Sequence, residues 1–301
     1  MVARQAHNLK VGGSIPPSAT KPLNERHFYF MKTPEQIEFT KLQNRLTKRF
    51  HKACADFSLI EQGDHILIGL SGGKDSLALV ELLGRRAQIF VPRFHVTAIH
   101  VRVRERAYLT DISYLQSFCD EFHVPLLVRD TEIGEPPATA QLINSAAHQH
   151  AVPNSAAHQH AVPNSAAEKD PCFLCSWYRR KALFDAAREL GCNKIAFGHH
   201  KDDIVETLLM NLIFQGNFST IYPKLQMDKM PLQLIRPLCL IEESDLRRYA
   251  ALRGYESQKQ LCPFEKASSR AEVKQLITSL EQLNPNVRDS LWGAITRLKP
   301  L

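Results

Sequence analysis

One segment constrains the fold of this chain more than any other, the run ILIGLSGGKDSLAL at residues 66–79. Its apolar start is typical of a buried strand, and the residues after its two glycines resemble the first turn of a helix. Glycine lets backbone amides approach a phosphate, and a helix N-terminus offers unpaired N–H groups and a favourable dipole. Lys74 is followed by Asp75, so the G-x-x-x-x-G-K-[ST] pattern of a Walker A loop is absent. The segment predicts a phosphate site of another kind.

Short apolar runs alternate with helical patterns after residue 60. We expect strands at 65–70, 96–103, 126–129, 194–197 and 232–236, with helices at 76–86, 110–122, 177–190, 202–214 and 242–253. This alternation predicts an α/β fold with a doubly wound, parallel, five-stranded sheet and helical extensions at both ends. Ligands of such sheets bind at the carboxyl ends of the strands, where the glycine loop and Gly198-His199-His200 both fall.

The net charge of +7 is concentrated near the start of the chain. Residues 1–52 hold ten Lys or Arg and three Asp or Glu, whereas the remaining chain holds 28 of each. The spacing of Leu42, Leu46 and Phe50 predicts an amphipathic helix. Its other face carries a row of cations at Lys41, Arg45, Lys48, Arg49 and Lys52. A cationic arm suits a polyanionic partner, because bound phosphates release counterions, but a solvated charged helix fits the pattern equally well.

Composition excludes some classes of protein. No apolar run is long enough to cross a bilayer and the start lacks a signal pattern, so we expect a cytoplasmic protein with no membrane partner. Seven cysteines in 301 residues do not indicate a disulfide framework. Four lie in apolar surroundings and are expected to be small buried side chains: Cys54, Cys119, Cys192 and Cys239. The pair Cys172-x-x-Cys175 indicates metal or redox chemistry instead.

An internal duplication helps to divide the chain. Residues 144–153 and 154–163 both read NSAAHQHAVP, a small, polar sequence that we interpret as a flexible insertion over 144–167 rather than as a histidine metal site. We expect four parts: a disordered leader at 1–30, a basic helix at 31–60, a core domain at 61–256 that holds the phosphate site, and a C-terminal helical segment at 257–301 that carries Cys262.

A second motif strengthens the first. Asp202 and Asp203 follow His199 and His200 in the run GHHKDDIVET and open a predicted helix. Paired carboxylates at this place bind Mg²⁺ or cap the helix. Together with SGGKDS, the run resembles the GHxxDDxxET segment of the PP-loop ATPases that modify tRNA, a superfamily that splits ATP into AMP and pyrophosphate.

Three cysteines narrow the resemblance. Cys172 and Cys175 open a helix that continues through Arg179-Arg180-Lys181, and Cys262 lies 87 residues beyond Cys175. Here the chain resembles the tRNA 2-thiocytidine synthetase family, which thiolates cytidine 32 in the anticodon loop with the help of an oxygen-sensitive [4Fe–4S] cluster. The resemblance implies that these three cysteines ligate the cluster and leave one iron open. The family often shows a second CxxC-type cysteine near the third ligand, and here Pro263-Phe264-Glu265 replaces it.

The resemblance also implies roles for the other residues. Those expected to hold the ATP phosphates are Ser71, Gly72, Gly73, Lys74, Asp75 and Ser76. His199 and Asp203 are expected to contact nucleotide or Mg²⁺, and Lys74, Asp75 and Asp202 to act in catalysis. The implied partners are tRNA, a sulfur donor such as a cysteine desulfurase, and a second copy of the chain in a homodimer.

Three alternatives remain open. A lysidine synthetase also adenylates tRNA but does not need the three cysteines together. An enzyme that forms 2-thiouridine shares the chemistry, yet its group typically carries terminal zinc-binding cysteine pairs. A non-catalytic RNA-binding protein with zinc or an iron–sulfur cluster would have no need of an intact SGGKDS loop.

Overall fold

The computed structural model describes residues 33–104, 110–134, 171–228, 230–256, 258 and 269–298. The predicted leader, the repetitive insertion and Cys262 lie outside these residues. The chain divides into two compact units, Met1–Glu38 and Phe39–Leu301. In the described part of the first unit, Gln36 N–H donates to Thr33 Oγ1 (3.2 Å) and Thr33 N–H donates to Gln36 Oε1 (2.9 Å). This reciprocal pair caps the start of helix α2 (Pro34–Asp56).

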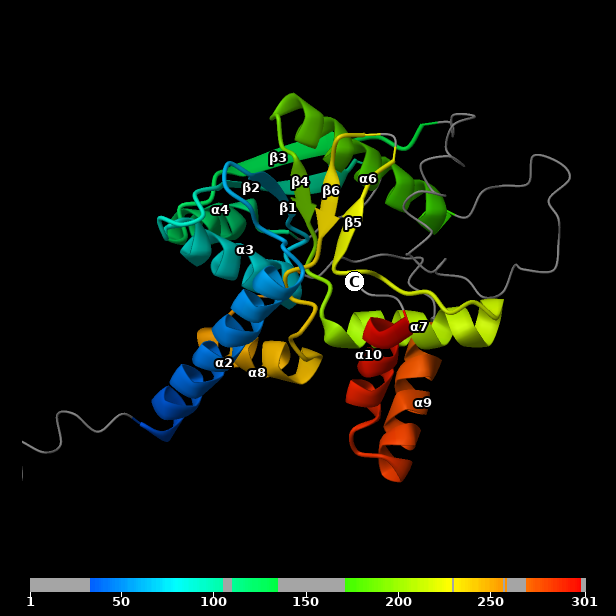
Figure 1. Ribbon diagram of the computed structural model, residues 1–301. Coiled ribbons are helices and arrows are strands. Elements are labelled where there is room, and N and C mark those ends of the chain that lie inside the picture. Colours follow the sequence, from blue (N-terminus) through cyan, green and yellow to red (C-terminus); the bar gives the residue numbers. More distant parts are fainter. Residues whose placement is uncertain are drawn as a thin grey trace, which may run out of the picture. The chain divides into compact units, whose positions relative to one another are not determined.

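The second unit is built on a six-stranded sheet in the order β3-β2-β1-β4-β6-β5 (Figure 1). Its strands are β1 (His65–Gly69), β2 (His95–Val103), β3 (Leu126–Thr131), β4 (Lys194–Ala196), β5 (Lys224–Gln226) and β6 (Gln233–Ile235). All neighbouring strands are parallel except β5 and β6. The predicted α/β class and all five predicted strands are confirmed.

The predicted number of strands was one too few. The extra strand, β5, lies at the edge of the sheet and pairs antiparallel with β6. It has only three residues, and none of them is fully buried. It is therefore held by backbone pairing with β6 and not by an apolar pattern, which leaves no periodic signal in the sequence.

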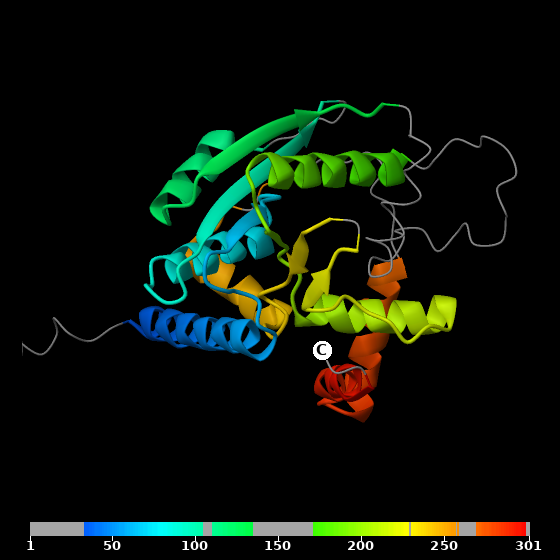
Figure 2. The ribbon, with the colours of Figure 1, turned by 45° about the horizontal axis from the view of Figure 1, so that its top comes forward.

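Helices cover both faces of the sheet (Figure 2). Besides α2, the described helices are α3 (Lys74–Ala87), α4 (Ile112–Glu121), α6 (Pro171–Glu189), α7 (Lys201–Gln215), α8 (Glu243–Arg253), α9 (Ser269–Leu283) and α10 (Val287–Leu298). Side chains of α2, α3, α4 and α8 pack into the core on one face, and those of α6 into the core on the other. In β1, Ile66 and Ile68 face the first core and Leu67 faces the second. The strand is apolar throughout because both of its faces are buried.

The order of the strands places a ligand crevice beside β1. The chain passes from β1 to β2 and β3 on one side of the sheet, and returns to β4 on the other side of β1. The direction of winding therefore reverses between β1 and β4. In open α/β sheets, ligands bind at this reversal, outside the carboxyl ends of the strands.

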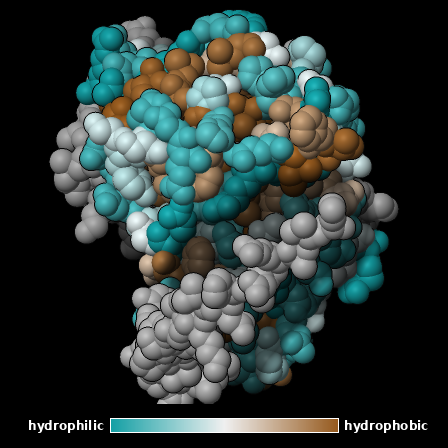
Figure 3. Space-filling view, turned by 90° about the vertical axis from the view of Figure 1, so that its left-hand side faces the viewer, coloured by the Kyte–Doolittle hydropathy of each residue, from teal (hydrophilic) through white to brown (hydrophobic). Residues whose placement is uncertain are grey.

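The C-terminal helices pack against α7. Figure 1 shows α9 and α10 side by side next to that helix, and Val205 and Leu209 of α7 form a small apolar cluster with Val273 and Ile277 of α9. Among the described helices, none is both long and apolar enough to span a membrane. On the face shown in Figure 3, hydrophilic side chains surround separate hydrophobic areas.

A buried lysine joins β4 to the turn before β1. Lys194 is 1% exposed, and its Nζ contacts Asp64 (2.8 Å) and Glu61 (3.0 Å) and donates to Leu59 O (3.1 Å). Asp64 is also buried and accepts a hydrogen bond from Asn193 Nδ2 (2.8 Å). This polar cluster fixes the entry of both strands that border the crevice.

Replacing Lys194 tests how much this cluster stabilises the fold. Lys194→Met leaves the buried Asp64 without its cation, so we expect the free energy of unfolding to fall by about 3 to 5 kcal/mol. Lys52→Met is the matched control, because Lys52 forms an exposed pair with Asp56 (2.6 Å), and should change it by no more than about 0.5 kcal/mol. Urea denaturation measures both. Equal losses in the two variants would contradict the account.

Candidate functional site

The glycine loop lies between β1 and α3, in a conformation that its residue types explain. Gly72 adopts a φ of +85°, which glycine tolerates far better than other residues. The buried Ser76 hydroxyl donates to Gly73 O (2.9 Å) and accepts from Gly72 N–H (3.2 Å). Gly73 is the N-cap of α3, and because glycine has no side chain, no cap hydrogen bond forms there within the described residues. The first N–H groups of α3 are therefore left for an anion.

A second chain segment crosses this loop at Gln258. Gln258 N–H donates to Gly72 O (3.0 Å), and its Oε1 accepts from Asp111 N–H (2.6 Å). A Cβ at Gly72 would lie 2.8 Å from Gln258 Cβ, so only glycine fits beneath it. The sequence gives no motif for this contact. Gln258, which stands four positions before Cys262 in the sequence, therefore contacts the phosphate loop.

The two predicted motifs meet at the crevice. A Cβ added at Gly198 would lie 3.1 Å from the carbonyl carbon and oxygen of Asp75 and 3.2 Å from Ser76 N. The absence of a side chain at position 198 therefore allows the connection from β4 to α7 to contact the start of α3. Gly198-His199-His200 and the glycine loop lie together at the carboxyl edge, as the sequence predicted.

Lys74 and Asp75 present charged groups beside the loop. Lys74 Nζ contacts Asp75 Oδ2 (3.1 Å) and Glu243 Oε1 (3.3 Å). Asp75 Oδ1 is buried and has no hydrogen-bond partner among the described residues. Buried carboxylate oxygens normally have a partner, so this oxygen fits a cation or a donor brought by a ligand.

The two histidines differ in their environments. His200 caps α7: Asp203 N–H donates to His200 Nδ1 (3.3 Å), and His200 N–H donates to Asp203 Oδ2 (2.9 Å). His199 Nδ1 is buried without a partner among the described residues. Burial, reinforced by the charge of Arg236, lowers the pKa of His199 to about 4, so its ring is neutral at neutral pH. His200 is thus a structural cap, whereas His199 offers an unused ring nitrogen.

The carboxylates predicted to place Mg²⁺ are already engaged by protein groups. Asp202 Oδ1 pairs with Arg288, and its Oδ2 accepts from Glu243 N–H (2.7 Å). Asp203 Oδ1 pairs with Arg270 (2.7 Å), and its Oδ2 belongs to the His200 cap. All four oxygens have a partner. This geometry favours a structural role for both aspartates, which join the start of α7 to α8, α9 and α10.

Cations of α9 complete this network. Arg270 also contacts the buried Glu206 of α7 (2.8 Å), and Lys274 contacts both Glu206 (3.7 Å) and Glu243 (3.0 Å). Sequence reasoning missed Glu243, Arg270 and Lys274, because each pairs with residues distant in the chain and none stands in a recognisable motif.

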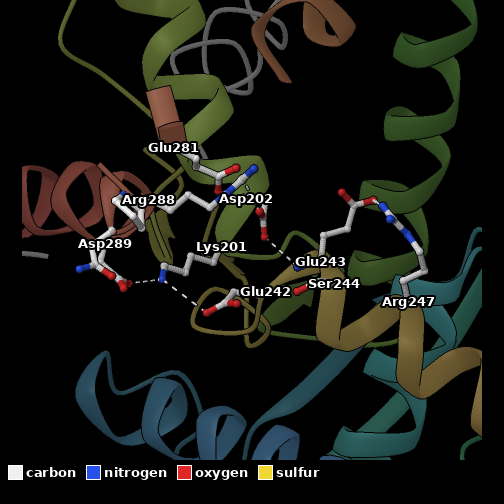
Figure 4. Close-up of a pocket in the computed structure, with 11 residues that line it drawn as sticks. Lys201, Asp202, Glu242, Glu243, Ser244, Arg247, Glu281, Arg288 and Asp289 are labelled. Atoms are coloured by element: carbon white, nitrogen blue, oxygen red, sulfur yellow. Dashed lines mark hydrogen bonds and ion pairs between the residues drawn. The ribbon is translucent and has the colours of Figure 1, made fainter. Parts of the chain in front are cut away.

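A polar cavity of about 330 Å³ lies beside Asp202, among α7, α8 and the connection between α9 and α10 (Figure 4). Figure 4 shows Asp202 and Arg288 directed at each other, with Lys201 between Glu242 and Asp289. Charged groups line most of this cavity, so it suits water or a polar ligand rather than an apolar one.

The cysteines fall into two groups. Cys119, Cys192 and Cys239 are buried, as predicted, whereas Cys54 is only half-buried and packs against the core. Burial raises the pKa of the Cys119 thiol to about 12 and that of Cys192 to about 11, which disfavours the thiolate form that binds metals. Cys175 is a free, half-buried thiol near the start of α6, and the backbone of Cys172 lies in the same helix. Cys262 lies outside the described residues, so the ligand set stays a prediction.

The basic row on α2 is partly neutralised. Arg45 pairs with Asp245 (2.6 Å), and Arg49 pairs with Asp245 and Glu242 (3.2 Å each). Lys52 pairs with Asp56 in its own helix. Three of the five cations thus have acidic partners, and this reduces the positive field that the sequence alone suggested for this face.

Known proteins with similar sequences include a PP-loop family and enzymes that modify tRNA. A family model for the PP-loop domain matches residues 40–153. A tRNA-cytidine(32) 2-sulfurtransferase from Paraburkholderia phymatum is 31% identical over 94% of this chain and 77% of its own. One from Marinomonas sp. is 33% identical over 88% and 86%.

A solved structure resembles the fold. The U34-tRNA thiolase from Methanococcus maripaludis, determined with its [4Fe-4S] cluster, aligns with a TM-score of 0.62 and 24% identity over 85% of this chain and 78% of that one. At this identity the likeness concerns the fold. The alignments to these two sulfurtransferases cover 94% and 88% of this chain. The chain therefore belongs to the tRNA-cytidine(32) 2-sulfurtransferase family of PP-loop proteins.

Proposed function

We propose that this chain replaces the C2 oxygen of cytidine 32 in tRNA with sulfur, at the expense of ATP. The observation that carries the proposal is the contact between the glycine loop and Gly198 at the reversal of the sheet, where nucleotides bind in open α/β folds. Family membership adds the substrate, because the relatives are named tRNA-cytidine(32) 2-sulfurtransferases.

ATP would bind with its phosphates on the glycine loop. The start of α3 supplies N–H groups for the phosphates. Ser71 and Ser76 hold the loop in shape, because their hydroxyls contact each other (3.1 Å) and accept hydrogen bonds from the amides of Gly73 (3.4 Å) and Gly72 (3.2 Å). Lys74 neutralises phosphate charge. The neutral ring of His199, with its unused Nδ1, is available to accept or donate one hydrogen bond to the nucleotide or the base.

We assign the Mg²⁺ that accompanies ATP to Asp75. Its Oδ1 is the buried oxygen without a partner in the described part of the site, whereas the oxygens of Asp202 and Asp203 are engaged. Carboxylate oxygen is the usual protein ligand of this ion. Asp202 would then support catalysis by fixing the start of α8 and not by binding the metal.

The reaction follows from these positions. The C2 oxygen of the cytidine attacks the α-phosphate of ATP, and pyrophosphate leaves with the charge that Lys74 and the amides at the start of α3 neutralise. A sulfur nucleophile then adds at C2, and AMP departs with the former C2 oxygen. Orientation and charge neutralisation supply most of the rate enhancement, since the loop does no covalent chemistry itself.

We propose Cys172, Cys175 and Cys262 as the ligands of a [4Fe–4S] cluster, for which thiolates are the usual ligands. Cys175 fits, because it is a free thiol at the start of α6. That end of α6 lies near the carboxyl edge of the sheet: a Cβ at Gly134, just after β3, would lie 3.0 Å from Tyr178 Oη. When bound, the cluster would supply the sulfur that reaches C2.

The remaining partners are also proposals. A cysteine desulfurase would supply the sulfur, and the protein would act in the cytoplasm, as a homodimer. Lys41 and Lys48 are the exposed cations of α2 that we assign to tRNA phosphates, because ion pairs engage Arg45, Arg49 and Lys52.

The ATP step is testable with substitutions at the two candidate Mg²⁺ positions. With tRNA present, the anaerobically prepared protein should convert ATP into AMP and pyrophosphate. Asp75→Asn removes the unpartnered carboxylate, and we expect kcat/KM for ATP to fall by about 100-fold and the Mg²⁺ concentration for half-maximal rate to rise. Asp202→Asn loses its pair with Arg288 and should lower the melting temperature without changing that Mg²⁺ concentration. If Asp202→Asn raised the Mg²⁺ concentration for half-maximal rate and Asp75→Asn did not, the metal would be assigned to Asp202 instead.

The cluster is tested by iron content. The wild type should be brown and contain about four iron and about four acid-labile sulfide ions per chain. Cys175→Ser should lose the colour, the iron and the sulfide. Cys119→Ala should keep them, because Cys119 is buried with a raised pKa. Stoichiometric zinc in a colourless wild-type protein, or full iron in Cys175→Ser, would refute the cluster assignment.

A further inference from the structure

We propose that Glu243, the first residue of α8, is a positioning residue that holds the Lys74 amine at the glycine loop for contact with ATP. The proposal rests on the proposed function, since it concerns the same nucleotide site. Its basis is the ion pair between Lys74 Nζ and Glu243 Oε1 (3.3 Å), which joins residues 169 positions apart.

The geometry of Lys74 leaves one donor for a ligand. A lysine ammonium has three N–H donors and no acceptor. Asp75 Oδ2 (3.1 Å) and Glu243 Oε1 (3.3 Å) engage two of them. The third has no partner within the described part of the chain, so a phosphate oxygen can accept from it while both carboxylates keep their places. Glu243 can therefore hold Lys74 before and after ATP binds.

Glu243 is itself fixed from three sides. Its Oε2 contacts Lys274 Nζ of α9 (3.0 Å), its Oε1 contacts Arg247 one turn later (3.2 Å), and its backbone N–H donates to Asp202 Oδ2 (2.7 Å). Burial raises the pKa of Glu243, but the bond to Lys274 and the charges of Lys274 and Lys74 outweigh it and lower the pKa to about 2. The carboxylate is thus ionised and anchored.

This anchoring matters because Lys74 has a long side chain. A free lysine loses rotamer entropy when it settles on a ligand, and a small displacement of a charged group from the reacting phosphate lowers the rate steeply. A fixed carboxylate removes most of that freedom in advance. Glu243 thereby links the Lys74 amine at the phosphate loop to α8 and, through Lys274, to α9.

The adjacent residue provides a matched control. Glu242 is a carboxylate next to Glu243, but its ion pairs within the described residues are with Arg49 (3.2 Å) and Lys201 (3.8 Å). Glu242→Gln therefore removes the same charge at the same helix start without touching Lys74. Lys274→Met is a second comparison, because it removes one support of Glu243 and leaves the pair with Lys74.

The experiment measures tRNA-dependent pyrophosphate release by the full-length, cluster-containing protein, with ATP and tRNA varied separately. For Glu243→Gln we expect kcat/KM for ATP to fall by about 10-fold to 100-fold. Its KM for tRNA should stay at the wild-type value, and its melting temperature should equal that of Glu242→Gln. Lys274→Met should show a smaller fall. ATP affinity, measured by calorimetry without tRNA, follows the same order and does not depend on turnover.

Three results would overturn the proposal. One is a Glu243→Gln enzyme within threefold of wild type in kcat/KM for ATP, and another is an equal fall in Glu242→Gln. The third is a fall in Lys274→Met as large as that in Glu243→Gln, which would trace the effect to the attachment of α9. A wild-type protein that releases no pyrophosphate would instead refute the proposed function, so the two failures are distinguishable.

Discussion

The candidate site depends on a backbone contact that has no room for a side chain. Gly198 lies against the carbonyl of Asp75 and the amide of Ser76, where a Cβ would come within 3.1 Å. This contact brings the connection from β4 to α7 onto the start of α3. Because β1 and β4 are neighbours on either side of the winding reversal, the contact falls where an open α/β sheet binds its ligand. Gln258 contacts the same loop, because its N–H donates to Gly72 O.

Charge organises the other side of the site. Asp202, Asp203, Glu206 and Glu243 lie close together, and their mutual repulsion is offset by cations of α9 and α10: Arg270, Lys274 and Arg288. The C-terminal helices therefore supply the counter-charges for the start of α7 and α8. Once these pairs have formed, Asp75 Oδ1 is the carboxylate oxygen left without a partner among the described residues of the loop. The separation between structural and reactive carboxylates follows from this pairing.

The sequence predicted what depends on local pattern. Apolar runs predict buried strands, and the residues SGGKDS predict the glycine loop. The sheet, the loop and its closeness to Gly198 could therefore all be predicted. β5 was missed because three half-exposed residues held by an edge pairing leave no pattern. Glu243 and Gln258 were missed because their partners lie 169 and 186 positions away and are chosen by packing. The domain boundaries and the place of Cys262 stay predictions.

The central claim is that this chain makes 2-thiocytidine in tRNA. The most direct measurement is mass spectrometry of the nucleosides of tRNA from cells that lack the chain, compared with the same cells after its gene is restored. The account predicts that 2-thiocytidine disappears in the first and returns in the second, while other thiolated nucleosides are unchanged. An unaltered 2-thiocytidine pool in the cells without the chain would contradict it.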